Sequence, residues 1–381
     1  MCDREVRLIH IAPELPPAVG GVADYTAILT QRLVEVSDGA VEPVLVHAGR
    51  QEADIVDADF PVVDLSGQCS AQALTDTLRE QIKRGEKNVV LLEYANYGYS
   101  AKGIPVWLIR GLNRVCRRGG VPLITMMHEL YATGPPWSGA FWYTGPQQVA
   151  AVWLARLSRH VVSNREDGVQ WLDRYRQAKK DILVQPVFSN VGEPDTLPPF
   201  ERRSSRVVVF GGGNKKSQIY RQNNDLLRAL STRHGYEEID DIGPSASCSD
   251  PSTESVTFHG VLPAATISEK MRAAGLGLLA YPSERLAKSG GGAAFAAHGL
   301  PFVLLDETPG GDASPYEEGT HFWRWSTLSA SPGLLDKDRL AGMSRALRAL
   351  YKEHMHSRVA ARRLAQMVTE TIASTNATAT S

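Results

Sequence analysis

The sequence predicts two α/β domains, each built on a parallel β-sheet with helices on both faces, and three observations lead to this prediction. Short apolar runs alternate with segments of helical spacing through both halves of the chain, a pattern typical of parallel strands joined by helices. A glycine loop lies between a predicted strand and a predicted helix in each half, at 20–21 and at 290–292. The chain has 381 residues, whereas one domain usually takes about 150.

The first half begins with an apolar strand at 6–11 and a helix at 22–36, in which apolar residues recur every three or four positions. Further strands are predicted at 41–46, 89–94, 121–127 and 161–163, helices at 106–116, 147–157 and 166–175, and a closing segment at 181–187. The next residues are rich in proline and polar side chains, which indicates a linker. We therefore expect an N-terminal domain at 1–190 and a linker at 191–205.

The second half restarts with an apolar strand at 206–210 and a run of three glycines. Its other predicted elements are a helix at 224–233, strands at 256–258, 275–281 and 302–305, and two closing helices at 336–354 and 357–372. These form a second domain at 206–372. The small, polar residues at 373–381 predict a disordered tail.

The composition is that of an ordinary globular protein, with 43% hydrophobic and 22% charged residues. A net charge of −1 gives no general attraction for nucleic acid or an anionic membrane, although it leaves room for a local basic patch. The four cysteines are scattered without metal-ligand spacing, which favours reduced thiols and a cytoplasmic location. No apolar run reaches the roughly 20 residues that a transmembrane helix needs.

The most informative stretch carries Lys288 and Ser289 into three glycines and a short alanine-rich helix. The first turn of a helix leaves backbone N–H groups unpaired and carries partial positive charge, so a phosphate can bind there. Glycine loops also occur simply to make turns. The presence of a second loop at Gly20 and Gly21, in the other half, favours two domains that bind one diphosphate-bearing ligand.

Several further motifs follow predicted strands in the same order as in a known family. They are Pro16–Tyr25, His128-Glu129, Val161–Asn164, Phe210–Lys216 with Arg221, Phe258–Val261, and Ser289–Gly291 through Gly299–Pro301. Together they resemble glycosyltransferase family four, whose GT-B fold has two Rossmann-like domains that face a central cleft. The resemblance spans about residues 8–305, and in this fold the C-terminal helix often crosses back to the first domain. The other interpretation of the 357–372 helix is a helix that lies on a membrane surface.

The chain departs from the family in its late donor loop. Many members carry two glutamates eight positions apart, and these positions are Leu286 and Ala294 here. Glu284 is two positions out of register with the first of them. Some bacterial relatives have a Ser-Gly pair in this loop, which Ser289-Gly290 matches. The family's usual basic pair is replaced by Lys215, Lys216 and Arg221, so the positive charge is kept. Which of these residues binds the donor phosphate is left open.

The resemblance implies a retaining glycosyltransferase that moves a sugar from a nucleotide-diphosphate sugar to a hydroxyl acceptor of unknown class. It also implies that the domain at 1–190 binds the acceptor and that the domain at 206–372 binds the nucleotide-sugar donor. The implied catalytic residues are His128, Lys216 and Arg221. The implied donor-binding residues are Gly20, Gly21, Gly212, Gly213, Lys215, Glu284, Lys288, Ser289, Gly290 and Gly291. The implied acceptor-binding residues are Asp24, Tyr25, Asn96, Tyr97, Glu129 and Trp137. The aromatic loop at 131–145, which contains Trp137, either binds acceptor or packs on its own domain.

Positive side chains and helix dipoles can neutralise a leaving diphosphate without a metal. Because protein cations can take the place of a metal, we expect no metal and no cofactor beyond the sugar-nucleotide co-substrate. Two alternatives share the predicted fold: a sugar-nucleotide epimerase, and a non-catalytic binding or partner subunit. A dehydrogenase is disfavoured because the first glycine loop lacks the G-x-G-x-x-G spacing.

Overall fold

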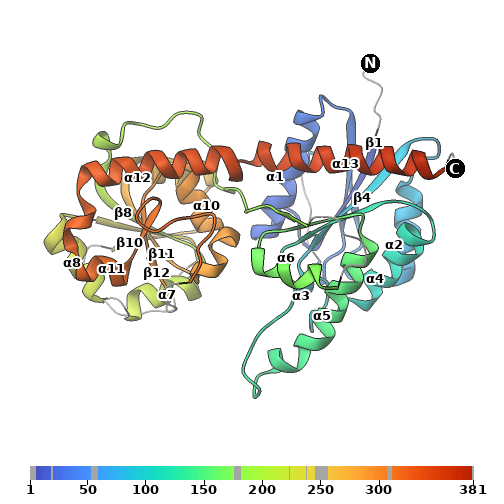
Figure 1. Cartoon of the computed structure of the whole chain (residues 1–381), viewed down its shortest axis with the longest axis horizontal. Helices are drawn as coiled ribbons and strands as arrows, with labels where there is room; N and C mark the ends of the chain where they lie inside the picture. Colours follow the sequence, from blue (N-terminus) through green and yellow to red (C-terminus); the bar gives the residue numbers. More distant parts are fainter. Residues whose placement is uncertain are drawn as a thin grey trace. The chain divides into compact units, whose positions relative to one another are not determined.

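The structure is a computed structural model that describes residues 6–18, 20–52, 59–175, 182–222, 224–236, 238–244, 256–306 and 311–379. The side chains at 221–225, 332 and 374–379 lie outside the described part. The chain divides into two compact units (Figure 1). Unit 1 is Met1–Gln185 with Ser357–Ser381, and unit 2 is Pro186–His356.

Unit 1 contains a seven-stranded sheet in the order β3-β2-β1-β4-β5-β6-β7, and its strand pairs are parallel. Its strands are β1 (Val6–Ala12), β2 (Val41–His47), β3 (Val62–Asp64), β4 (Lys87–Tyr94), β5 (Leu123–Met127), β6 (His160–Ser163) and β7 (Leu183–Val184). Its helices are α1 (Gly21–Val36), α2 (Ala71–Gln81), α3 (Asn96–Tyr99), α4 (Val106–Leu112), α5 (Gly139–Leu157), α6 (Glu166–Asp173) and α13 (Ser357–Ala379), and a π-helical turn (Asn113–Arg117) continues α4.

Unit 2 contains a six-stranded parallel sheet in the order β10-β9-β8-β11-β12-β13. Its strands are β8 (Ser204–Phe210), β9 (Glu238–Ile242), β10 (Val256–Gly260), β11 (Ala274–Ala280), β12 (Phe302–Leu305) and β13 (Phe322–Arg324). Its helices are α7 (Gly213–Gln222), α8 (Asn224–His234), α9 (Ala264–Ala273), α10 (Gly290–Ala297), α11 (Trp325–Ala330) and α12 (Lys337–Leu350). The prediction of two parallel-sheet α/β domains is confirmed.

The central strands are apolar because helices cover both of their faces. Every residue of β1 and of β11 is buried, which explains why these strands are continuous apolar runs rather than alternating ones. The largest apolar cluster of unit 1 surrounds its sheet and includes Ile9, Leu92 and Leu154. Unit 2 has its own cluster, which includes Val209, Leu278 and Met343. Each unit therefore has the separate hydrophobic core expected of a domain.

The C-terminal helix α13 belongs to unit 1, as the crossing-back prediction required. It lies beside α1 (Figure 1). Arg32 of α1 donates to the Ser357 hydroxyl over 3.0 Å, and Arg363 donates to the Gln185 side chain over 2.8 Å. Ala360 and Leu364 face Leu29 of α1 across a small apolar cavity. The helix is therefore packed onto its own unit by both apolar and polar contacts.

The division into units differs from the predicted domain boundaries at both crossings. The chain leaves unit 1 after Gln185, and the segment predicted as a linker at 191–205 lies in unit 2. This segment is anchored there, because Glu193 accepts a hydrogen bond from Tyr351 over 2.6 Å and Arg203 donates to the carbonyls of His298 and Gly299. The α13 helix, predicted as part of the donor domain, returns to unit 1 and extends through Ala379, beyond the predicted end at 372.

Four elements of unit 1 were not expected, namely β3, α2, the short α3 and the first two turns of α5. The prediction made 131–145 a long loop, whereas α5 begins at Gly139 and contains Pro146. The Ser138 hydroxyl caps this helix by accepting a hydrogen bond from the Phe141 N–H over 3.4 Å. Proline and glycine lower helix propensity, which is why the sequence pattern concealed this part of the helix.

The buried histidine at the end of α10 leads to a prediction about pH. His298 donates to the Ala294 carbonyl and contacts the Ser268 hydroxyl, each over 2.7 Å. Burial, with nearby arginines, lowers the pKa of His298 to about 4. In the unfolded chain the pKa of histidine is about 6.5, so the unfolded state binds more protons between these values. The contribution of neutral His298 is complete above pH 6.5, and on the order of 3 kcal/mol is lost as the pH falls through 4.

We expect a His298→Gln variant to show a shallower loss of unit 2 stability between pH 6.5 and pH 4 than the unsubstituted protein. Hydrogen exchange of α10 and β12 amides at several pH values measures this difference for unit 2 alone. Equal slopes in the two proteins would show that another group carries the pH dependence.

Candidate functional site

The strand order of each sheet reverses direction once, and the predicted site residues follow the strands at these reversals. In unit 1 the chain moves outward from β1 to β3 and then returns to β4 on the other side of β1. In unit 2 it moves outward from β8 to β10 and returns to β11. Ligands of open α/β sheets bind beyond the carboxyl ends of the strands at such a switch point.

The two loops at the switch point of unit 2 lie against each other. β8 leads into the glycines at 211–213, and β11 leads through Tyr281 to Ser289 and α10. The Lys215 amine lies 5.0 Å from the centre of the Tyr281 ring. A Cβ on Gly291 would lie 3.3 Å from the Phe210 carbonyl oxygen. The structure thus brings together Lys215, the 211–213 glycines and the start of α10.

The start of α10 has the features of an anion site. The Ser289 hydroxyl is buried and accepts a hydrogen bond from the Gly292 N–H over 3.1 Å, so it fixes the first turn. Gly290 is exposed, and a Cβ placed on it would meet no atom within 4 Å. The exposed first-turn amide of Gly290 and the positive end of the helix dipole can therefore be approached by a phosphate oxygen.

Lys216 was predicted to act on the donor phosphate, but the structure gives its charge another partner. Its side chain is 1% exposed and is paired with Asp241 of β9. It also donates to the Gly243 carbonyl over 3.2 Å, while Tyr220 donates to the second Asp241 oxygen over 2.5 Å. The Lys216 cation is therefore neutralised inside unit 2, where it joins α7 to β9 and Gly243 instead of contacting a ligand directly.

The remaining donor candidates are more dispersed. Glu284 is exposed in the short 3-10 turn Ser283–Lys288, and Lys288 at its end is half-buried. Gly20 and Gly21 lie in unit 1 at the start of α1. The predicted Arg221 lies in α7, but its side chain is outside the described part of the chain.

Unit 1 holds a buried carboxylate that the sequence analysis did not single out. Glu93 of β4 is fully buried, and one of its oxygens lies 2.9 Å from Nε2 of His10 in β1. The other oxygen lies 2.6 Å from Nε2 of His128, just after β5. Burial alone would raise the pKa of Glu93, but the hydrogen bonds and charges of the two imidazoles outweigh it and lower the pKa to about 2. Glu93 is therefore ionised at neutral pH.

The ionised carboxylate determines which atoms donate in this triad. A carboxylate only accepts, so Nε2 of both His10 and His128 must carry a proton. Nδ1 of His10 lies 2.8 Å from the Thr30 hydroxyl, which gives its own proton to the Thr26 carbonyl over 2.7 Å. His10 is therefore held at both ring nitrogens, one by Glu93 and the other by Thr30.

His128 and Tyr25, predicted for catalysis and acceptor binding, are brought together by this triad. Their rings meet edge to face with centroids 5.0 Å apart. Tyr25 is buried, and burial, with the nearby Glu93 charge, raises the pKa of its phenol well above the usual value. His128 is only 6% exposed and directs Nε2 inward to Glu93. Any ligand contact by His128 must therefore use the rest of the ring, with Glu93 fixing the tautomer.

Asn96 and Tyr97 follow β4, and Tyr97 has a partner that the sequence analysis missed. Gln147 of α5 donates to the Tyr97 hydroxyl over 3.1 Å and to the Lys102 carbonyl over 2.8 Å. The Asn96 side chain is 1% exposed, and among the described residues its amide nitrogen has no hydrogen-bond partner. Tyr97 is partly exposed.

The other acceptor candidates do not gather around one point in the described contacts. Asp24 is half-buried in α1, and Glu129 is half-buried after His128. Trp137 is 86% exposed at the end of the loop before α5. The residues that sequence reasoning missed, His10 and Glu93, had one usable signal: each is a polar side chain inside a strand whose neighbours are all apolar.

Across the described ranges, no group of three or more His, Cys, Asp or Glu side chains is arranged to hold a metal ion. The oxygens of Glu93 are instead hydrogen-bonded to ring nitrogens.

Comparison with solved structures identifies the fold. The chain is similar to WaaG, a glycosyltransferase involved in lipopolysaccharide biosynthesis, with a TM-score of 0.59 and 12% identity over 95% of this chain and 99% of that one. It is also similar to a UDP-N-acetylglucosamine 2-epimerase, with a TM-score of 0.52 and 11% identity over 90% of this chain and 91% of that one. A glycotransferase of kitacinnamycin gives a TM-score of 0.50 at 12% identity, over 95% and 98% of the two chains.

No protein-family model matches the sequence, and no curated protein matches it. The two parallel-sheet units and the returning α13 nevertheless define the GT-B fold, as predicted. This fold is shared by glycosyltransferases and sugar-nucleotide epimerases.

Proposed function

We propose that this protein is a retaining glycosyltransferase that transfers a sugar from a nucleotide-diphosphate sugar to a hydroxyl acceptor. The observation that carries the proposal is the pair of adjoining glycine loops at the switch point of unit 2, after β8 and β11. These loops place an open helix N-terminus beside the cationic Lys215. Among common ligands, a diphosphate is the one that best matches several backbone donors and a nearby positive charge.

In this proposal unit 2 binds the donor. Cleavage of the anomeric C–O bond leaves negative charge on the β-phosphate of the departing nucleoside diphosphate. The N–H groups at Gly290 and Gly291 and the amines of Lys215 and Lys288 stabilise that charge, which lowers the barrier without a covalent enzyme intermediate. Lys216 and Asp241 act indirectly, because their buried pair fastens the start of α7, which follows the 211–213 glycines, to β9 and Gly243.

Unit 1 binds the acceptor in this proposal. His128 is held by Glu93 and Tyr25 at the carboxyl end of β5. Asn96 and Tyr97, after the neighbouring β4, supply polar groups beside the same sheet edge. Retention follows from attack on the same face as the departing phosphate, which accepts the proton of the acceptor hydroxyl. The reaction then needs no pair of carboxylates of the kind that glycosidases use.

A substitution at Gly290 tests the donor site without disturbing the fold. Gly290→Val adds a side chain into open space, so we expect the melting temperature to stay close to that of the unsubstituted protein. The same side chain would block a phosphate from the first-turn amides. We expect at least a tenfold loss of nucleoside-diphosphate affinity, which is about 1.4 kcal/mol. A thermal-shift panel of UDP, GDP, ADP and TDP selects the nucleotide, and calorimetry then measures it.

Gly342→Val is the matched control, because Gly342 lies in α12 and also has open space around its Cα. The control should bind the nucleotide normally. If Gly290→Val also bound it normally, the diphosphate site would not be at α10.

The reaction itself separates the alternatives. A transferase incubated with its sugar nucleotide and no acceptor should slowly release nucleoside diphosphate. Interconversion of two sugar nucleotides without release would favour an epimerase, the activity named for one of the similar structures. Nucleotide binding without any turnover would favour a binding subunit.

A further inference from the structure

One surface of unit 1 exposes large apolar side chains where charged ones are expected. In α5 and the loop before it, Trp137 is 86%, Trp142 is 71% and Trp153 is 55% exposed. Phe141 and Val149 are 45% and 55% exposed. The solvent-facing side of a surface helix is normally charged or polar. An exposed apolar face of this kind usually marks an interaction surface.

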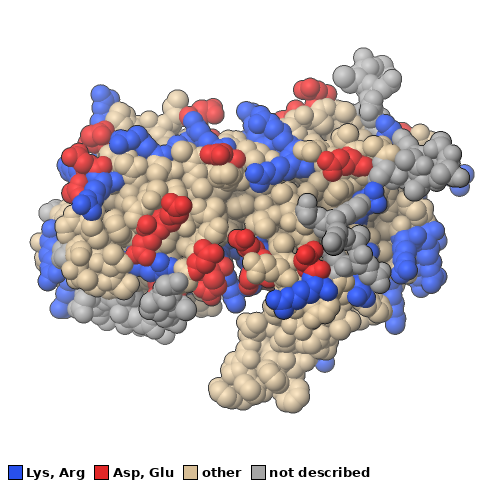
Figure 2. Space-filling view, viewed as in Figure 1, with Lys and Arg blue, Asp and Glu red and all other residues tan. Residues whose placement is uncertain are grey.

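The apolar residues form one stripe along the helix. Trp142, Val149 and Trp153 are separated by seven and four residues, so at roughly 100° per residue they lie on the same side of α5. The opposite side, which includes Ala151 and Leu154, is buried against the core of unit 1. The stripe is therefore not turned toward the core of its own unit. Figure 2 shows that the projecting end of this region carries no charged side chain on the visible face.

Positively charged side chains lie on the same surface as this stripe. The sequence from 94 to 165 contains eight Lys or Arg residues and a single acidic one, Glu129, in a chain whose net charge is −1. Exposed arginines lie on α4, on the turn after it and near the end of α5: Arg110, Arg114, Arg117, Arg118, Arg156 and Arg159. The segment from 130 to 155 has no charged residue at all. Apolar and basic character are thus separated along the same surface.

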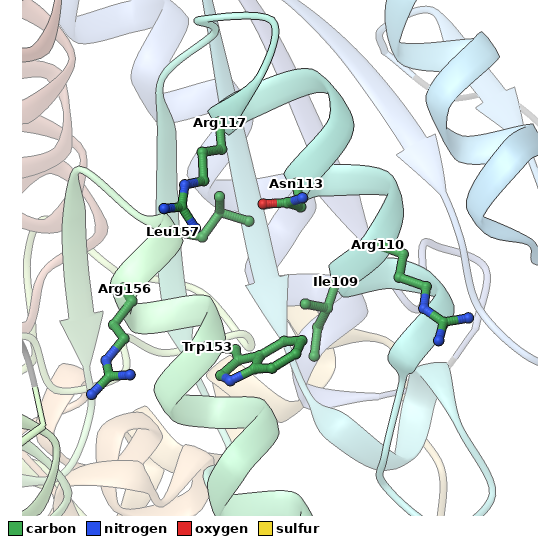
Figure 3. Close-up of a pocket in the computed structure, with 7 residues that line it drawn as sticks. All are labelled: Ile109, Arg110, Asn113, Arg117, Trp153, Arg156 and Leu157. Carbon is green, nitrogen blue, oxygen red and sulfur yellow. The ribbon is translucent and has the colours of Figure 1, made fainter.

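A pocket joins the basic and the apolar parts. It has a volume of about 410 Å³ and lies between α4 with its following turn and the last turns of α5. Figure 3 shows the Trp153 ring on one side of it, Arg117 beside Leu157 on the other, and Arg110 and Arg156 at opposite edges. Arg156 is held by a 3.0 Å hydrogen bond to the Tyr175 carbonyl. Guanidinium groups close to an aromatic ring in one pocket suit a phosphate joined to an apolar chain.

We propose that this face of unit 1 docks on a membrane surface that contains anionic phospholipids. The α5 stripe inserts its tryptophans at the level of the headgroups, where amphipathic rings are favoured. The arginines around the pocket bind lipid phosphates. Nucleic acid would need the positive charge but not the uncharged, tryptophan-rich stripe. No helix in the described part of the chain has the length and apolar character to cross a bilayer, so the proposed docking is peripheral.

Sedimentation with lipid vesicles tests the proposal on the full-length chain. The unsubstituted protein should bind vesicles of phosphatidylcholine with 30 mol% phosphatidylglycerol and bind pure phosphatidylcholine much more weakly. Binding to the anionic vesicles should weaken as salt is added, because salt screens the arginines. Tryptophan fluorescence should shift to the blue on binding and should be quenched by brominated acyl chains.

Two pairs of variants assign the binding to this face. Val149→Asp should weaken binding at least tenfold, whereas Val261→Asp, a change at a similarly exposed valine of unit 2, should not. The double variant Arg110→Ala/Arg117→Ala should weaken binding by about 30-fold, since each cation near an anionic surface contributes about fivefold. Arg228→Ala/Arg345→Ala removes the same charge from exposed positions of unit 2 and should bind normally.

Three results would overturn the proposal. The first is no binding of the unsubstituted protein to anionic vesicles. The second is equal binding by Val149→Asp and Val261→Asp. The third is sedimentation equilibrium without lipid that shows a dimer broken by Val149→Asp, because the stripe would then join two copies of the chain. None of these results depends on sugar transfer, so they are independent of the proposed activity.

Discussion

Replacing Asp241 by alanine should destabilise unit 2 by about 3–5 kcal/mol, the usual cost of removing one partner of a buried ion pair. The substitution leaves the Lys216 ammonium, which is 1% exposed, without its counter-charge. It also removes the acceptor of the Tyr220 hydroxyl. Unfolding of the two units need not be a single transition, so hydrogen exchange of β8 and β9 amides is the appropriate measurement.

Two further variants separate the lost pair from a general disturbance of the strand. Glu238 lies on the same strand as Asp241, β9, and forms an exposed ion pair with Arg206 of β8. We expect Glu238→Ala, which removes this pair, to cost no more than about 1 kcal/mol of unit 2 stability. The double variant Lys216→Met/Asp241→Leu removes both charges and should be more stable than Asp241→Ala, because no uncompensated charge remains. A double variant less stable than the single one would contradict this account of the pair.

Replacing Glu93 by glutamine should have an effect of similar size on unit 1. A glutamine has one accepting oxygen and one donating nitrogen, so it cannot accept hydrogen bonds from both His10 and His128. One buried imidazole would then lose its hydrogen-bond partner. We expect a loss of about 3–5 kcal/mol, measured by hydrogen exchange of β1 and β4 amides, and a lower kcat if His128 acts in transfer.

The pair of the buried His47 with the solvent-exposed Asp64 supplies the control for this variant. The Asp64 side chain is 46% exposed and lies 2.9 Å from Nδ1 of His47, so Asp64→Asn should cost at most about 1 kcal/mol. If Glu93→Gln were as mild as Asp64→Asn, the triad would not stabilise unit 1.

The same carboxylate gives unit 1 a sensitivity to acid. The pKa of Glu93 is about 2 in the folded protein and 4.5 as its ordinary value. Its stabilising contribution is therefore complete above pH 4.5 and is lost as the pH falls toward 2. The Glu93→Gln variant should lack this part of the acid-induced loss of unit 1 stability.

The sequence predicted the sheets well because buried parallel strands leave a strong local pattern. β1 and β11 are continuous apolar runs, and both were predicted within one residue at each end. β3 has three residues, none of them fully buried, and was not recognisable. The predicted linker at 191–205 failed for another reason. Its prolines and charges indicate an irregular path, but its attachment to Tyr351 and Gly299 depends on residues far along the chain.

The candidate site was also predictable only in part: its backbone loops were predicted, and its side-chain partners were not. The glycine loops after β8 and β11 could be found because their order along the chain is diagnostic, and the sheet topology places both at one switch point. The side-chain partners could not. Lys216 is equally consistent with a phosphate ligand or a buried pair until Asp241 is known to lie beside it. Likewise, the role of His128 depends on Glu93, which is 35 residues earlier in the chain.

The return of α13 to unit 1 makes that unit discontinuous, since its last helix is synthesised after the whole of unit 2. On the ribosome, the surface of α1 that α13 covers must stay exposed until the residues of α13 emerge. A fragment that ends at Gln185 would lack this cover, and a nonsense change before residue 357 would leave Leu29 and its neighbours facing water. The surface of the first unit is thus completed by a helix that follows all of unit 2 in the chain.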